Sequence, residues 1–224
     1  MPTISKENYL KAIYQSIALG ETATTSKLSR ELNVSDAAIS DMAKKLSKEG
    51  LISYEKYKGV VLTKEGQKIA LKVIRRHRLW ELFLTKVLGI PWGEVHNEAE
   101  RLEHHSSEEL INKIDEYLGY PTFDPHGDPI PKSNGDLPSM PKFFPLTKTK
   151  VGTTYKVVRV DDKNTELIKY FSKIGLAING KIKILERLSF DNSINIEMNN
   201  KFFTFSEKVA SSIYVNEFIN EKEK

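Results

Sequence analysis

Residues 25–50 read TSKLSRELNVSDAAISDMAKKLSKEG, and their pattern is the most informative one in the first part of the chain. Its first eight residues have the spacing of a short amphipathic helix, and Asn33 and Val34 follow as a turn. Ser35 is a favourable N-cap for a further helix that runs to about Lys48, and Gly50 is placed to end it. Two short helices joined by a tight turn predict a helix-turn-helix.

The flanking segments extend this motif to a winged helix-turn-helix over residues 1–65. Apolar residues recur with helical spacing between Lys6 and Leu19, which predicts a preceding helix with Ser5 as its N-cap. The stretch 51–63, LISYEKYKGVVLT, contains two β-rich runs around Lys58 and Gly59 and is typical of a hairpin.

The middle of the chain has a helical pattern, which predicts a second domain over residues 66–120. One helix is expected from residue 63 to about 88 and another over 94–118. The first is unusually apolar for one small domain to cover, which predicts a homodimer. Its apolar residues are Ile69, Leu71, Ile74, Leu79, Leu82, Phe83, Leu84, Val87 and Leu88.

The last part of the chain predicts a linker followed by a small β-rich domain. Seven of the nine prolines lie between Pro121 and Pro145, which indicates an extended linker over residues 121–149. Beyond it, four alternating segments predict strands, residues 165–174 predict a helix, and Asn199–Asn200 predicts a hairpin turn. A small β-barrel over residues 150–224 makes the whole chain α+β.

Composition and charge restrict the possible functions. The chain has no cysteine, which excludes disulfides, zinc–thiolate sites and thiol catalysis. It also has no apolar stretch of spanning or signal-peptide length, so we expect a cytoplasmic protein that makes no membrane contact. The net charge is +6 over residues 1–76, −6 over 77–144 and +4 over 145–224. A basic first part beside an acidic middle favours a nucleic-acid surface joined to a cation-binding region.

The acidic middle contains EAERLEHH at residues 98–105, with three carboxylates and two imidazoles in eight positions. On a helix, His96, Glu100, Glu103 and His104 project within about one-third of the circumference. His77 and Glu81 are spaced i, i+4 on the preceding helix and share a face as well. Such clusters without thiols suit Mn²⁺, Fe²⁺, Co²⁺, Ni²⁺ or Zn²⁺. Exposed helices also carry Glu and His as ordinary solvated pairs, and that alternative stays open.

The stretch RRHRLWELFLTKVLGIPWGEVHNEAERLEHHSSEEL at 75–110, with PHGDPIP at 125–131, resembles the diphtheria-toxin-repressor family of metal-dependent repressors. The resemblance covers nearly the whole chain. It implies a winged helix, dimerisation helices, a proline-rich linker and a C-terminal SH3-like domain. It also implies a homodimeric repressor of metal-uptake genes that binds double-stranded operator DNA when Mn²⁺ or Fe²⁺ is bound.

The family's metal-ligating positions fall on seven residues of this chain. The resemblance implies a primary site at Asn8, Glu100, Glu103 and His104, and an ancillary site at His77, Glu81 and His96. Asp161, Asp162 and Glu166 are candidates for an extra ancillary ligand from the SH3-like domain, whereas His105 and His126 are expected to be peripheral.

Two positions of the primary site depart from part of the family. Glu100 replaces the cysteine of iron-type members, as in manganese-type members, and its hard oxygen favours Mn²⁺ over softer metals. Asn8 stands where manganese-type members have aspartate and iron-type members have methionine. A neutral amide contributes less charge, so the affinity of this site depends on whether Asn8 is a ligand. Lys11 replaces a carboxylate that some short members use.

The start of the third helix is expected to read base edges in DNA, and nearby lysines are expected to contact phosphates. Small residues there permit close approach to thymine methyl groups. Asp41 either accepts from a cytosine amine or is simply solvated, and each lysine can equally belong to a solvated basic surface. The expected DNA-binding residues are Ser35, Ala37, Ala38, Ser40, Asp41, Lys44, Lys45, Lys56 and Lys58.

Two other functions remain open from the residues alone. The His/carboxylate faces also occur in di-metal enzymes, but no Ser/His/Asp set, P-loop or glycine-rich phosphate motif accompanies them here. We therefore expect no enzymatic activity. A metal-independent winged-helix regulator is the other alternative, because Asn8 weakens one site.

Overall fold

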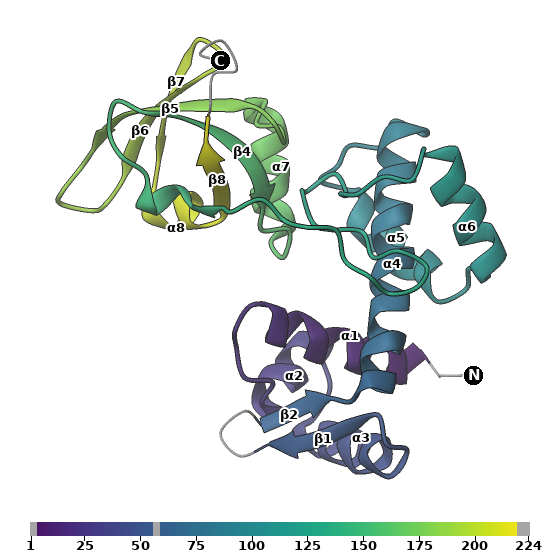
Figure 1. The fold of residues 1–224 in the computed structure, drawn as a ribbon. Coiled ribbons are helices and arrows are strands. Elements are labelled where there is room, and N and C mark those ends of the chain that lie inside the picture. The colour runs from purple at the N-terminus through teal and green to yellow at the C-terminus, as the bar shows by residue number, and fades with distance from the viewer. Residues whose placement is uncertain (1–3, 56–58, 219–224) are drawn as a thin grey trace.

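A computed structural model describes residues 4–55 and 59–218, and Figure 1 shows three regions along the chain. The first is the winged helix, built from α1 (Ile4–Ala18), α2 (Thr25–Leu32), α3 (Asp36–Lys48), β1 (Ile52–Glu55) and β2 (Gly59–Leu62). The strands pair antiparallel, from Ile52 opposite Leu62 to Glu55 opposite Gly59. Their apolar faces join α1, α2 and α3 in one core that includes Tyr9, Leu28 and Leu46.

The helix ends follow the capping chemistry predicted for α3 but not for α1. The Ser35 side chain accepts a hydrogen bond from the Ala38 amide at the start of α3, and Gly50 has a φ of 69° just beyond its end. Thr24 caps α2 in the same way. The prediction of Ser5 as the N-cap of α1 is wrong, because the helix already includes Ile4.

The second region begins with α4 (Lys64–Lys86), a helix that runs from the winged helix into the centre of the molecule (Figure 1). The helix expected over residues 94–118 is in fact two, α5 (Val95–Glu103) and α6 (Glu108–Tyr117). Ser107 explains the break, because its side chain accepts from the Leu110 amide and so starts a new helix.

The proline-rich segment is not a free extended tether, so that prediction needs correction. Asp124, His126, Asp128 and Ile130 are all buried. Ile130 packs with Leu79, Leu82, Ile111 and Ile114 in the core of the helical region. Residues 122–130 fold back on themselves, with the Ile130 amide donating to the Thr122 carbonyl over 2.9 Å.

The third region contains β3 (Phe144–Pro145), η1 (Leu146–Lys148), β4 (Thr154–Val160), α7 (Thr165–Ile174), β5 (Lys181–Arg187), β6 (Ile194–Met198), β7 (Lys201–Phe205), α8 (Glu207–Ser211) and β8 (Ile213–Glu217). Its strands form a six-stranded antiparallel sheet in the order β3-β8-β4-β5-β6-β7. Register shifts beside Val157 and Ile184 mark bulges, which bend the sheet. Asn199 and Asn200 form the expected turn, both with positive φ. The sequence prediction did not include β3, α8 or β8.

The sheet domain is fixed to the helical region through the folded part of the linker. The Val160 amide of β4 donates to the His126 carbonyl over 2.9 Å. Gly127 lies so close to β4 that a Cβ there would be 2.1 Å from the Val158 carbonyl oxygen. Figure 1 shows α7 on the side of this domain that faces α4 and α5. None of the helices described is both long and apolar enough to cross a bilayer.

Candidate metal centre

The three residues of the expected ancillary site lie together between α4 and α5. The Nε2 atom of His77 is 3.0 Å from Oε1 of Glu81 and 3.2 Å from Nδ1 of His96. One potential ligand atom from each residue lies within 4.8 Å of the others. The i, i+4 spacing on α4 points both side chains at α5, which supplies the third.

A second His/carboxylate cluster shares Glu81 and adds two residues from the linker. Ligand atoms of Glu81, Asp124 and His126 also lie within 4.8 Å of one another, and all three residues are buried. The expectation that His126 is peripheral is therefore wrong. Its ring stacks on Trp92 with centroids 5.3 Å apart, and the folded linker turns it towards α4.

The second cluster contains buried polar atoms that make no hydrogen bond. Among the described residues, Oε2 of Glu81, Oδ2 of Asp124 and Nδ1 of His126 have no hydrogen bond and are shielded from water. Oε2 of Glu81 and Nδ1 of His126 lie 3.6 Å apart, and Oδ2 of Asp124 is 3.6 Å from Nε of Arg78, beyond hydrogen-bond distance. Buried polar atoms are rarely left unpaired in proteins. The two carboxylates and the imidazole therefore fit a divalent cation with oxygen and nitrogen ligands.

The three acidic candidates of the sheet domain differ in position. Asp162 lines an interdomain cavity together with His77 and His96, and burial and the charges of Asp128 and Glu81 raise its pKa. Glu166 instead points to solvent and pairs with Lys169 over 3.3 Å. An oxygen of Asp161 accepts from the Lys163 amide. Asp162 is thus the one of the three that is placed towards the clusters.

The residues of the expected primary site line one pocket of about 430 Å³ at the junction of α1 and α5. Asn8 comes from α1, Glu100 and Glu103 from α5, and His104 follows α5 directly. His105, expected to be peripheral, lies on the same pocket and is exposed. The structure brings all four predicted residues to one place.

Glu7 is a site residue that the sequence reasoning missed. It is buried on α1, and its Oε2 atom lies 2.6 Å from Nδ1 of His104. His104 also reaches Glu103, with Nε2 3.2 Å from Oε1. The i, i+4 spacing of Glu7 and Lys11 was the one available signal, since it places both side chains on the same side of α1.

Glu103 connects the primary and ancillary sets, which are therefore not separate in this structure. Its Oε2 atom is 2.6 Å from Nδ1 of His77. Its two oxygens also accept hydrogen bonds from the Lys11 ammonium over 3.0 and 2.9 Å. Glu100 likewise approaches His96, with 3.5 Å between Oε1 and Nε2. The candidate ligands form one network that joins α1, α4 and α5, buried at His77, Glu81 and Glu103 and exposed at Glu100.

Comparison with known families assigns each region of this architecture. Residues 1–60 match the iron-dependent repressor N-terminal DNA-binding domain, residues 63–132 its metal-binding and dimerisation domain, and residues 144–217 the FeoA domain. A manganese-dependent transcriptional repressor in complex with manganese is 34% identical, with a TM-score of 0.86 over 95% of this chain and 100% of that one. The chain belongs to the iron-dependent repressor family, also known as the diphtheria-toxin-repressor family.

Other relatives show the same domain arrangement or part of it. ScaR with bound Zn²⁺ is 33% identical, with a TM-score of 0.81 over 97% of this chain and 100% of that one. The iron-dependent repressor IdeR of Mycobacterium bovis is 36% identical over 125 residues. That match covers 56% of this chain and 54% of IdeR, so it spans about half the length of that relative.

In this member of the family, the candidate ligands neutralise one another through paired charges. Burial would raise the pKa of Glu103, but hydrogen bonds from His104 and His77 and the charge of Lys11 hold it well below its usual value. Burial would lower the pKa of His96, yet hydrogen bonds to Glu100 and Glu81 raise it to about 10. A metal bound by these imidazoles would have to replace their protons.

The expected DNA-reading surface of this family member lies on α3. Ala37, Ala38 and Asp41 are exposed, as are Lys44 and Lys45. The two serines are less free to contact bases. Ser35 caps the helix, and the Ser40 hydroxyl donates to the Asp36 carbonyl over 2.9 Å. Asp41 pairs with Lys44 over 3.3 Å. Lys56 and Lys58 lie outside the described residues.

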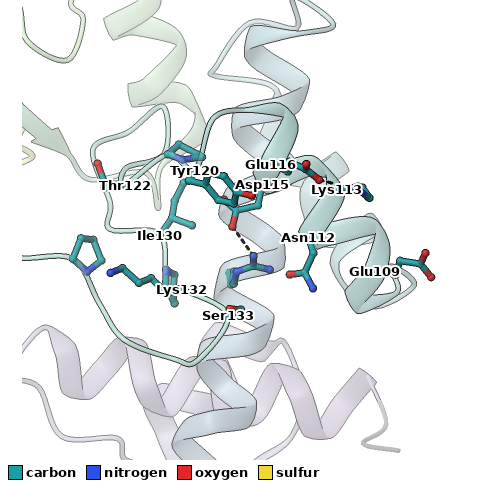
Figure 2. Close-up of a pocket in the computed structure, with 14 residues that line it drawn as sticks. Glu109, Asn112, Lys113, Asp115, Glu116, Tyr120, Thr122, Ile130, Lys132 and Ser133 are labelled. Carbon is teal, nitrogen blue, oxygen red and sulfur yellow. Dashed lines mark hydrogen bonds and ion pairs between the residues drawn. The ribbon is translucent and has the colours of Figure 1, made fainter.

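A larger hollow of about 730 Å³ between α4, α6 and residues 120–138 lies apart from the candidate ligands. Figure 2 shows Asp115 and Tyr120 on one side of it, with Lys132 and Ser133 on the other. Two of its lining residues join α4 to α6 through a 2.7 Å ion pair between Arg75 Nη2 and Asp115 Oδ2. None of the predicted ligands lines it.

Proposed function

We propose that this protein is a homodimeric transcriptional repressor that binds operator DNA when Mn²⁺ or Fe²⁺ occupies the His/carboxylate network. One observation carries the proposal. The network joins α1, a helix of the DNA-binding domain, to α4 and α5 of the helical region through buried groups that can ligate a cation. Family membership supports it, because relatives of known structure include a manganese-dependent repressor in complex with manganese.

The donor set supports Mn²⁺ or Fe²⁺ as the activating ion. Asn8, Glu100, Glu103 and His104 would hold one ion, and Glu81 with His77 and His96, or with Asp124 and His126, would hold another. A bound divalent ion supplies positive charge to a set rich in carboxylates. Hard oxygen ligands suit Mn²⁺, although in a test tube other divalent metals such as Zn²⁺ bind such sites more tightly.

The residues of the chain explain how ligation at this place would affect DNA binding. Glu7 and Asn8 belong to α1, so ligands or partners on this helix move with the winged helix. His77, Glu81, Glu100 and Glu103 belong to α4 and α5, which form the base of the dimer. Fixing α1 on this base sets the distance between the two recognition helices, which must match two half-sites on DNA.

We infer that dimerisation uses the helical region. Most of the apolar residues of α4 are already buried within the chain, so the apolar content of α4 alone does not require a dimer. Exposed apolar side chains remain at Val87 and Leu88 after α4 and at Leu110 and Tyr117 on α6. These side chains, with the family match to a dimerisation domain over residues 63–132, support the homodimer.

Metal dependence of DNA binding tests this function directly. Fluorescence anisotropy would follow a duplex from the promoter of the chain's own gene region during titration with protein, in chelator and in saturating Mn²⁺, Fe²⁺ or Zn²⁺. We expect binding at least about tenfold tighter with Mn²⁺ than with chelator, a coupling of about 1.4 kcal/mol. Equal affinity in all conditions would indicate a metal-independent winged-helix regulator instead.

A further inference from the structure

Lys11 is a buried lysine with an unusual set of neighbours. Its side chain comes from α1 and is only 8% exposed. The ammonium donates to both oxygens of Glu103, over 3.0 and 2.9 Å, and lies 3.3 Å from Nδ1 of His77. A positive charge of the chain itself thus lies among residues that could ligate a cation.

The contacts of Glu103 leave little room for a further ligand. Besides Lys11, its Oε2 atom is 2.6 Å from His77, and its Oε1 atom is 3.2 Å from Nε2 of His104. The carboxylate is 1% exposed. The ammonium would repel a divalent ion at an oxygen of Glu103, because like charges repel each other strongly away from water.

The same contact joins two parts of the molecule. Lys11 lies on α1 of the winged helix, whereas Glu103 ends α5 of the helical region, 92 positions later in the chain. A buried, doubly hydrogen-bonded ion pair of this kind restrains both partners, since separating them leaves a charge without a partner.

We propose that the Lys11 ammonium stands in for a metal ion at Glu103, holding α1 on α5 before any divalent ion binds and competing with one for that carboxylate. The first part, a tether between α1 and α5 made by Lys11 and Glu103, follows from the contacts alone. The second part, competition between the ammonium and a metal ion for Glu103, rests on the proposed function. On this proposal, α1 is restrained on α5 before a metal binds. The metal must displace an internal cation, which weakens its binding at Glu103.

Replacing Lys11 by methionine removes the charge and keeps most of the side-chain volume. The variant therefore shows the effect of the ammonium separately from that of the metal ion. In metal-free protein, hydrogen exchange would be measured for the α1 amides, and titration calorimetry would follow Mn²⁺ binding in parallel. We expect K11M to speed exchange in α1 by about tenfold, because the opening of α1 becomes easier. We also expect it to tighten the Mn²⁺ binding that involves Glu103 by at least about tenfold.

Lys6→Met provides the matched control. Lys6 lies on the same helix but pairs with Glu49 inside the winged helix, away from the candidate ligands. The Lys6→Met variant should therefore change neither the hydrogen exchange of α1 nor the binding of Mn²⁺. Lys11→Arg keeps the charge and should behave like the natural chain in α1 exchange. If K11M does not fold, Lys11→Gln, which is also uncharged, is tested instead by α1 hydrogen exchange and Mn²⁺ calorimetry.

Each result bears on the proposal separately. Unchanged α1 exchange in K11M would remove the tether, and unchanged Mn²⁺ affinity would remove the competition, so either result overturns the proposal. A different observation would overturn the proposed function, namely Mn²⁺ binding without any effect on operator affinity. Faster α1 exchange in metal-free K11M would still support the tether in that case.

Discussion

The Nδ1 atom of His104 lies 2.6 Å from Oε2 of Glu7, a contact between residues 97 positions apart in the chain. It connects the residue after α5 with the buried face of α1. Nη1 of Arg76 is a second neighbour of Glu7, 3.5 Å from its other oxygen. Glu7 is thus one contact between the winged helix and the helical region, and its carboxylate faces two cationic groups.

Glu7→Ala is expected to weaken metal-activated operator binding by about tenfold. It removes a hydrogen bond to a charged group, worth on the order of 1.5–3 kcal/mol, from the junction that orients the winged helix. Fluorescence anisotropy at saturating Mn²⁺ measures the effect. Glu65→Ala is the control, because Glu65 is exposed on α4 and pairs only with Lys68 among the described residues. Full activation of the Glu7 variant would exclude this role.

Glu103→Ala is expected to destabilise the metal-free protein by on the order of 3–5 kcal/mol, because it leaves the buried charge of Lys11 without its partner. Urea unfolding followed by circular dichroism measures the change. Adding Lys11→Met to this variant should recover part of the loss, since both charges are then absent. If the double variant is no more stable than Glu103→Ala, other groups must stabilise the Lys11 ammonium as well as Glu103 does.

Local patterns predicted the parts of the site that lie on one helix or at one turn. The capping role of Ser35 followed from its place before α3, and the alignment of His77 with Glu81 followed from the period of a helix. The turn at Asn199 and Asn200 needed only two residues that tolerate positive φ. Each of these depends on neighbours in the sequence.

Contacts between distant segments could not be read in the same way. The burial of His126 depends on how residues 122–130 fold back against α4, and prolines alone indicated an extended segment. The hydrogen bond between Glu7 and His104 depends on how α1 packs beside α5. Neither follows from local periodicity, because the packing angle of two helices is set by the whole core.

Gly127→Ala is expected to loosen the sheet domain from the helical region. Gly127 has a φ of 89°, and a Cβ there would lie 2.1 Å from the Val158 carbonyl oxygen of β4. Gly135→Ala is a matched control, because its φ is 91° but its Cβ would meet only Leu71, at 3.8 Å. Small-angle scattering should show a larger radius of gyration for Gly127→Ala alone. Equal radii would show that β4 can move to accept the methyl group.

Charges on the outer face of α6 are expected to break the homodimer. Leu110 and Tyr117 are 45% and 71% exposed and lie seven residues apart, on the same face of the helix. The double variant Leu110→Asp, Tyr117→Asp should sediment as a monomer at micromolar concentration. Asn112→Asp adds a charge to a polar, exposed position of α6 and should leave the dimer intact. A dimeric double variant would place the interface elsewhere on the helical region.

Asn8→Asp is expected to tighten activation by Mn²⁺. Asn8 lines the pocket formed with Glu100, Glu103 and His104, so a carboxylate there adds a negative charge beside a bound cation. The gain should be on the order of 1 kcal/mol or more in a partly buried pocket, which lowers the Mn²⁺ concentration for half-maximal operator binding about fivefold or more.

The same charge should make the metal-free Asn8→Asp protein slightly less stable, because it joins the carboxylates already in that pocket. Asn97→Asp is the matched control, since Asn97 lines the same pocket from α5 and adds an identical charge without being a predicted ligand. An equal gain from both variants would mean that the added negative charge attracts Mn²⁺ from either position, without direct ligation by residue 8. Unchanged activation in Asn8→Asp would place position 8 outside the ligand set, and lost activation would mean that the amide donates a hydrogen bond that a carboxylate cannot replace.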